Sequence, residues 1–299
     1  LIFAECYRPL ITKNLKKFLQ TLKKNLEIYF WYRDAFKSKK KDESSKFYVY
    51  GSDEIWNFTN AYHGYDPYYF GKDNNLNKIS YAASIGRSSF NNIKDNLRNE
   101  ITNCLNKFNH ISVRDHNSFN FVNKLTGIKP SIVLDPTLIH TPKILESEKY
   151  IKFKVNKNYI VVYGTVFSDE QKRLINNFSK RRKLDIISVG YYNNWIKKNY
   201  LGLNPTNFID VIKNSSFVFT SMFHGVMFSV KYSKQFLLSM DPIRKNKIES
   251  FINSLNLNNR IFENQIIEDE IDYYQIYKKL NPLIIESQKF LIDNLNNLK

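Results

Sequence analysis

Cysteine, long apolar runs and arginine are all scarce in this chain of 299 residues. The two cysteines, Cys6 and Cys104, are too few for a disulfide framework or a cysteine-based metal site. No run approaches the roughly 18 uncharged apolar residues of a membrane-spanning helix. The chain also has no zinc, Walker or G-x-G-x-x-G motif. We therefore expect no metal and no resident cofactor.

The first residues carry no recognisable export signal. The segment LIFAECYRPL is apolar, but it is short and has no basic residues before it. With so few cysteines and no signal, we expect a cytoplasmic protein. The chain begins at Leu1 rather than at methionine, so we expect a further segment upstream.

Positive charge, by contrast, is abundant. The chain has 45 Lys and Arg against 28 Asp and Glu, which gives a net charge of +17. Such a charge is typical of proteins that bind nucleic acid, phosphate or a lipid surface. Only ten of the 45 are arginines, however, and 37 asparagines accompany the lysines, as in AT-rich coding sequences. We interpret most of the charge as a solvated lysine surface, so a bidentate clamp on an anion must come from the ten arginines.

The pattern of the chain predicts an α/β fold. Hydrophobic residues make up 42% of it, which excludes disorder over most of its length. Short apolar runs occur at residues 47–50, 79–83, 110–113, 131–134, 160–163, 186–189, 217–220 and 236–240. Helical patterns alternate with them, as expected for parallel sheets built from β-α-β units.

Proline and polar residues at 136–157 predict the division into two domains. We expect an N-terminal α/β domain over residues 1–145 and a C-terminal one, with the last helices, over 150–299. Residues 11–30 predict a basic amphipathic helix, which either packs on a core or lies on an anionic membrane. Residues 271–298 predict a long helix that packs back across the domain boundary.

Polar clusters that follow strands are the candidate sites, because open α/β sheets bind ligands at the carboxyl ends of their strands. The first cluster is GSDEIWN, in which Ser52, Asp53 and Asn57 bind a ligand or cap a turn, and Trp56 forms an apolar wall. The aromatic-rich loop after it either forms a platform for a sugar or packs in the core. The second cluster is YAASIGRSS, where Arg87 either meets a ligand or belongs to a helix cap.

Two further clusters follow later strands. In ISVRD, Arg114 either points into a cleft or pairs with its neighbour Asp115. In FVFTSMFHGVMFSVKYSKQF, a buried strand ends near Ser221 and a helix begins near His224 and Gly225. Amides at a helix N-terminus favour anions, and an imidazole there suits a general acid or a phosphate ligand. A purely structural histidine remains the alternative.

In this order, the motifs GSDEIWN, YAASIG, ISVRD, VLDPTL and TSMFHGVMFSV resemble the polysaccharide pyruvyl transferase family. The resemblance continues in DPIRKNKIESFINSLNLNNRIFE and covers residues 47–295. It implies two Rossmann-like domains with a central cleft, the glycosyltransferase-B-like arrangement, with the acceptor on the N-terminal side. The implied reaction moves a pyruvyl group from phosphoenolpyruvate to sugar hydroxyls of a surface-polysaccharide precursor, such as a lipid-linked oligosaccharide.

The resemblance also implies roles for residues. His224 matches the family's histidine and is the candidate general acid, and Arg114 is the candidate clamp on the donor. Asp53 is our candidate base, from its position at a strand end. The other candidate substrate-binding residues are Ser52, Asn57, Arg87, Ser221, Gly225, Arg244 and Lys247.

One departure from the family concerns the donor. Many members carry an arginine two residues before the histidine, where this chain has Met222. Loss of such a charge-assisted pair is worth about 1.5–3 kcal/mol, or about ten- to a hundredfold in affinity. Either Arg87, Arg244, Lys245 or Lys247 replaces the arginine, or this branch uses another donor.

Three other functions therefore remain open. The first alternative is a nucleotide-sugar-dependent glycosyltransferase of similar architecture. The second is a catalytically lapsed scaffold. The third is a nucleic-acid-binding protein, but no helix-turn-helix, RRM or KH pattern supports it, so we expect no nucleic acid among the partners.

Overall fold

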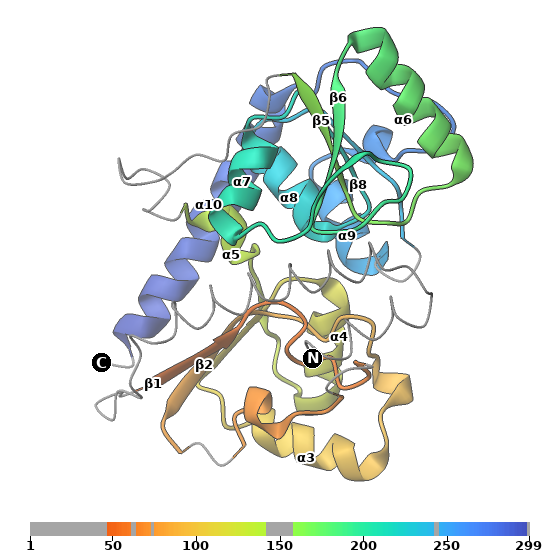
Figure 1. Ribbon diagram of the computed structural model, residues 1–299. Helices are drawn as coiled ribbons and strands as arrows, with labels where there is room; N and C mark the ends of the chain where they lie inside the picture. The colour runs from red at the N-terminus through yellow and green to blue at the C-terminus, as the bar shows by residue number, and fades with distance from the viewer. Residues whose placement is uncertain (1–46, 61–63, 73–74, 142–157, 242–244, 298–299) are drawn as a thin grey trace. The chain divides into compact units, whose positions relative to one another are not determined.

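The fold is described from a computed structural model, which describes residues 47–60, 64–72, 75–141, 158–241 and 245–297 (Figure 1). These residues form two separate parallel sheets with helices between the strands. The predicted α/β class with Rossmann-like halves is thereby confirmed, while the central cleft stays a prediction. The predicted helix over residues 11–30 lies outside the described residues.

The first sheet contains four parallel strands in the order β1-β2-β3-β4. They are β1 (Phe47–Gly51), β2 (Asn77–Ala83), β3 (His110–Val113) and β4 (Ser131–Ile132). The helices between and after them are η1 (Pro67–Phe70), η2 (Phe90–Asn92), α3 (Asp95–Leu105), α4 (His116–Thr126) and α5 (Pro136–Ile139). Because all four strands are parallel, their carboxyl ends meet at one edge.

The core of this sheet contains Trp56, which was expected to form the wall of a ligand site. Its side chain is fully buried, and its ring stacks on Phe70 with centroids 5.8 Å apart. Its indole nitrogen donates to the carbonyl of Tyr69 at 2.9 Å. A Trp that is enclosed and hydrogen-bonded in this way stabilises the fold and is not available to a ligand.

The second sheet contains five parallel strands in the order β7-β6-β5-β8-β9. They are β5 (Tyr159–Tyr163), β6 (Asp185–Val189), β7 (Lys198–Tyr200), β8 (Phe217–Thr220) and β9 (Phe236–Leu238). The helices of this part are α6 (Asp169–Arg182), α7 (Pro205–Lys213), α8 (Phe223–Lys231) and η4 (Asn258–Arg260). Since β5 pairs with β6 on one side and β8 on the other, the strand order reverses there, at the kind of switch point where such sheets bind ligands.

The last helices do not belong to the domain to which the sequence assigned them. The structure divides into a second-sheet unit, which includes Thr141–Asp241 and Leu257–Tyr273, and a first-sheet unit. The first-sheet unit includes Asp42–His140, Pro242–Asn256 and Tyr274–Lys299, and so contains α9 (Lys245–Ser254) and nearly all of α10 (Tyr273–Asn296). The predicted boundaries, 1–145 and 150–299, therefore differ from the observed division.

Contacts of α10 explain this difference. The ring of Phe290 lies 6.4 Å from that of Tyr81 on β2, and the Ser287 hydroxyl accepts a hydrogen bond from the amide of Leu134 at 2.9 Å. Tyr81, Ala82 and Val133 form a buried cluster against this helix. The apolar face of α10 thus covers the first sheet, because that sheet needs a partner to bury its residues.

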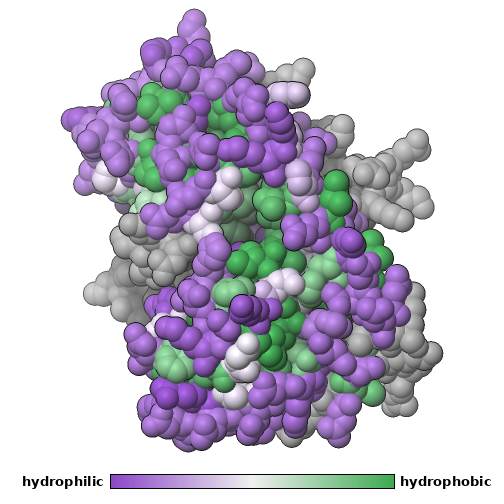
Figure 2. Space-filling view, turned by 180° about the vertical axis from the view of Figure 1, so that it is seen from behind, coloured by the Kyte–Doolittle hydropathy of each residue, from purple (hydrophilic) through white to green (hydrophobic). Residues whose placement is uncertain are grey.

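The surface is mostly polar on the face that Figure 2 shows, where hydrophilic residues cover most of the described chain. Within the described residues, no helix has both the length and the apolar composition needed to cross a bilayer.

Candidate functional site

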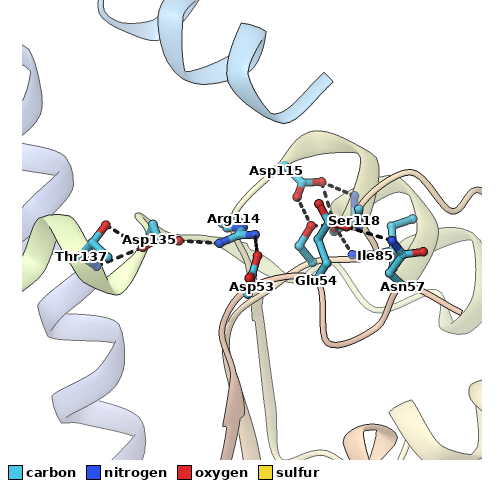
Figure 3. A network of polar contacts seen from close by, with 11 residues as sticks. Asp53, Glu54, Asn57, Ile85, Arg114, Asp115, Ser118, Asp135 and Thr137 are labelled. Atoms are coloured by element: carbon cyan, nitrogen blue, oxygen red, sulfur yellow. Dashed lines mark hydrogen bonds and ion pairs between the residues drawn. The ribbon is translucent and has the colours of Figure 1, made fainter. Parts of the chain in front are cut away.

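The carboxyl edge of the first sheet carries a chain of three charged residues (Figure 3). Arg114 follows β3, and its two terminal nitrogens contact different carboxylates. Nη1 donates to Oδ2 of Asp135 at 2.5 Å, and Nη2 donates to Oδ1 of Asp53 at 2.6 Å. The side chains of Arg114 and Asp135 are each 2% exposed, whereas that of Asp53 is 65% exposed.

Electrostatics keep Arg114 charged in this position. Burial works against the guanidinium charge, but Asp135 and then Asp53 outweigh it, so the pKa of Arg114 is raised above its ordinary value. A buried guanidinium that already binds two carboxylates has little surface left for a donor anion. This geometry favours a positioning role for Arg114 over the predicted clamp.

Asp115, the neighbour that the sequence offered as a partner for Arg114, has other contacts. Its Oδ1 accepts from the amide and the hydroxyl of Ser118, both at 2.8 Å, and thereby caps α4. Its Oδ2 accepts from the hydroxyl of Ser84 at 2.7 Å. Arg114 therefore pairs across the sheet edge and not along the chain.

Asn57, a predicted substrate-binding residue, joins two loops of this edge. Its side-chain oxygen accepts from the hydroxyl of Ser88 at 2.8 Å, and its nitrogen donates to Oε2 of Glu54 at 2.9 Å. Asn57 is buried, so its contacts support the fold. Arg87 is exposed, and its Nη2 donates to the carbonyl of Thr59 at 3.2 Å. Ser52 is half-buried in the turn after β1.

The carboxyl edge of the second sheet carries the N-terminus of α8, as the sequence predicted. Gly225 lies in the first turn of this helix, where a Cβ would lie 2.0 Å from Oγ1 of Thr220 on β8. Ser221 is fully buried, and a Cβ on Gly164 would lie 2.1 Å from its Oγ. These two glycines allow α8 and the turn after β5 to approach β8 closely. Gly225 and Ser221 thus shape the backbone of the site.

His224 occupies the second position of α8 and is half-buried. Its ring lies 5.4 Å from that of Phe223 in an edge-to-face arrangement and 6.4 Å from that of Phe228. Met222 is the N-cap of the helix and makes no side-chain capping bond. An imidazole beside the amides of a helix N-terminus can both contact an anion and transfer a proton.

Sequence reasoning missed an aromatic group at this edge. Tyr163 ends β5, and its ring contacts Phe208 of α7 at 4.8 Å and Tyr191, after β6, at 5.7 Å. All three residues are half-buried. The available signal was the tyrosine that ends the apolar run at 160–163, since a residue at a strand end borders the ligand-binding edge.

Other predicted residues are less well placed by the structure. Arg244 lies outside the described residues, and only the backbone of Lys247, in α9, is described. In the aromatic-rich loop, Phe58 and Phe70 are buried in the core while Tyr68 is exposed. Among the residues that the structure describes, no group of three or more His, Cys, Asp or Glu could hold a metal ion.

Three solved structures to which the chain is similar are distant likenesses. The chain is 11% identical to the UDP-GlcNAc 2-epimerase of Methanocaldococcus jannaschii, solved with UDP-GlcNAc and UDP, over 88% of this chain and 74% of that one, with a TM-score of 0.41. A putative UDP-N-acetylglucosamine 2-epimerase from Listeria monocytogenes gives 10% identity, coverage of 90% and 72%, and a TM-score of 0.40. The glycotransferase of kitacinnamycin gives 8% identity, coverage of 92% of this chain and 76% of that one, and a TM-score of 0.38. Likenesses this weak do not bear on function.

The comparison with protein families is decisive. No curated protein matches the chain. Residues 9–239, however, match the family described as polysaccharide pyruvyl transferase. The match covers most of the chain and includes both strand edges described above, so the chain belongs to the polysaccharide pyruvyl transferase family.

Proposed function

We propose that the protein transfers a pyruvyl group from phosphoenolpyruvate to two hydroxyls of one sugar, forming a pyruvate ketal and releasing phosphate. The acceptor is a surface-polysaccharide precursor, either a free sugar or a lipid-linked oligosaccharide. We further propose that the enzyme works in the cytoplasm without a cofactor. In this proposal its lysine-rich surface holds it near the anionic membrane that carries the acceptor.

The chemistry needs one acid and one base. A proton added to the methylene carbon of phosphoenolpyruvate makes it a methyl group and leaves positive charge on the neighbouring carbon. One sugar hydroxyl attacks that carbon and loses its proton, and the second hydroxyl then displaces phosphate. Of the two hydroxyl protons, one balances the proton that the methylene took up and the other leaves with phosphate.

His224 is our acid, and this assignment carries the proposal. It lies on α8 at the carboxyl end of β8, inside the segment that matches the family. The amides of the helix N-terminus favour a phosphate or carboxylate beside the imidazole. Asp53, exposed at the carboxyl edge of the first sheet, is our base for the sugar hydroxyl.

His224→Ala tests this assignment. We expect phosphate release from phosphoenolpyruvate with a sugar acceptor to fall by about 10²–10⁴-fold, the usual contribution of general acid catalysis. His110→Ala is the matched control, because His110 is exposed at the first residue of β3 and has no part in the proposed chemistry, so this variant should keep wild-type turnover. Unchanged turnover in His224→Ala would remove His224 from the mechanism.

The alternative donor is a nucleotide sugar, and Met222 is the observation that favours it. Methionine offers no charge for the phosphate or carboxylate of phosphoenolpyruvate at the N-cap of α8. A thermal-shift screen separates the two donors. Stabilisation by phosphoenolpyruvate supports the proposal, while stabilisation by a nucleotide sugar alone supports the glycosyltransferase.

A further inference from the structure

We infer that Arg114 and Asp135 form a fixed ion pair whose task is to position the carboxylate of Asp53. This inference rests on the proposed function, because Asp53 is the base of that proposal. It changes the part played by Arg114, which acts through Asp53 and does not contact the donor. It also gives a part to Asp135, which belongs to the VLDPTL motif and was not among the candidate site residues.

Asp135, at the buried end of these three charged residues, is held in place by hydrogen bonds. Asp135 is the N-cap of α5, and its Oδ1 accepts from the amide of Thr137 at 3.0 Å and from the Thr137 hydroxyl at 2.8 Å. Its other oxygen, Oδ2, accepts from Nη1 of Arg114. Both oxygens of Asp135 accept hydrogen bonds, and its side chain is almost fully buried. Its carboxylate therefore fixes the plane of the guanidinium that it binds.

Asp53, at the outer end of these three charged residues, is exposed to solvent. Because the guanidinium is planar and rigid, fixing Nη1 also fixes the direction of Nη2, which donates to Oδ1 of Asp53. The loop of Asp53 is held as well, since its carbonyl accepts from the amide of Ser84 at 3.0 Å. Asp53 itself has a φ of 57°, in the left-handed region that residues other than glycine seldom adopt.

The charges of the three residues suit a base. Two carboxylates share one guanidinium, so the three side chains together keep one net negative charge, and Asp53 is their exposed member. With Arg114 alone beside it, Asp53 would bind protons more weakly, since an opposite charge within 4–6 Å lowers a carboxyl pKa by roughly 1–3 units. Asp135 offsets much of the charge of Arg114 and thereby preserves the basicity of Asp53.

Other titratable groups lie on the elements that meet at this edge. They are Glu54 and Arg87 on the loops, Tyr81 on β2, Asp115 before α4, His140 after α5, and Glu286, Lys289 and Asp293 on α10. A substitution at position 135 leaves all of them in place. Their contributions are therefore common to the wild type and the variant, and a difference between the two reports the ion pair.

The test is Asp135→Asn, which keeps an oxygen for the cap of α5 but removes the charge beside Arg114. We expect the acid limb of kcat/KM for the phosphoenolpyruvate reaction to move down by about one pH unit. We also expect kcat to fall by about threefold to tenfold, because the base is weaker, while KM for phosphoenolpyruvate stays within about twofold. Asp135→Glu restores the charge and should return the acid limb toward that of the wild type.

Asp115→Asn is the matched control. Asp115 is also buried, caps a helix and lies at the same edge, but its described contacts are to Ser84 and Ser118. Its acid limb should move much less than that of Asp135→Asn, because the described contacts of Asp115 are not to Arg114 or Asp53. An unmoved limb in a folded Asp135→Asn protein overturns the inference, and so does a large rise in KM for phosphoenolpyruvate with kcat unchanged, which would make Arg114 a donor clamp.

Two further measurements keep the inference testable by itself. If the wild type releases no phosphate from phosphoenolpyruvate, the proposed function fails, but carbon-13 NMR of labelled aspartates, assigned with Asp53→Asn, still measures the Asp53 titration. A lower Asp53 pKa in Asp135→Asn supports the role of the ion pair, and an unchanged Asp53 pKa overturns it.

If Asp135→Asn does not fold, Arg114→Lys replaces it as the test variant. That variant keeps the positive charge but loses the guanidinium that binds two carboxylates at once, so kcat should fall about tenfold while KM for phosphoenolpyruvate is unchanged. A tenfold rise in KM overturns the inference.

Discussion

Gly225→Ala tests whether close packing of α8 on β8 sets the position of His224. A methyl group at position 225 would lie 2.0 Å from Oγ1 of Thr220 and 2.7 Å from its Cβ. Thr220 is fully buried and cannot turn away freely, because its Oγ1 donates to the carbonyl of Tyr163 at 2.9 Å and accepts from the amide of Met222 at 3.0 Å. The helix must therefore move.

Two effects oppose each other in this variant. Alanine is better than glycine in a helix interior by about 1 kcal/mol. Overpacking costs about 1–3 kcal/mol, and a weakened hydrogen bond of Thr220 about 1 kcal/mol more. We expect the free energy of unfolding to fall by about 2 kcal/mol in total, and Tm by about 4–8 °C. Displacement of the first turn of α8 should also lower phosphate release by about tenfold.

Thermal unfolding and a double-mutant cycle with Thr220→Ala provide the measurement. Thr220→Ala removes the hydroxyl that the new methyl group meets at 2.0 Å but keeps the Cβ at 2.7 Å, so Gly225→Ala should cost about 1 kcal/mol less in that background without becoming free of strain. A Gly225→Ala protein that unfolds at or above the temperature of the wild type would refute the reasoning, and so would a coupling free energy of zero.

Two other predictions concern donor binding and pH. Met222→Arg should tighten phosphoenolpyruvate binding by about ten- to a hundredfold, measured by calorimetry. The uncharged control Met222→Gln should not, and equal affinities would exclude an anion site at this N-cap. Lys78 is buried and donates to the carbonyl of Gly71 at 3.0 Å, and burial lowers the pKa of its ammonium. Between that lowered pKa and the unfolded value of about 10.4 the unfolded state binds more protons, so stability should rise with pH in the wild type. Lys78→Met should lack this rise. The measurement is the free energy of unfolding in urea for both proteins between pH 7 and 10.5, and the same pH dependence in the two proteins would contradict the prediction.

The strands of this fold were largely predictable from sequence. All eight apolar runs became strands, because short runs of apolar and β-branched residues stand out between helical patterns, even in β4, whose two residues are exposed. Among the residues that the structure describes, the strand that was missed is β7, Lys198–Tyr200, three half-buried and mostly polar residues at the sheet edge. These residues form a strand because they pair with β6, and a local sequence pattern does not reveal that pairing.

The candidate site was predictable in part. His224 at the start of α8 followed from a strand, a turn and a helix that are adjacent in the chain. The partners of Arg114 lie 61 and 21 residues away, and only the parallel sheet brings them to it. The adjacent Asp115 was the plausible partner by sequence, but the helix cap that it forms turns it away.

The interleaved order of the two units has a consequence for protein synthesis. The amide of Leu134 meets its partner Ser287 only after 153 further residues have been made. A nascent chain that ends near residue 241 would expose the Tyr81, Ala82 and Val133 cluster, and chaperones bind such apolar surface. An expression fragment of the first sheet should therefore join residues 42–140 to the last helix through a linker, instead of ending where the sheet ends.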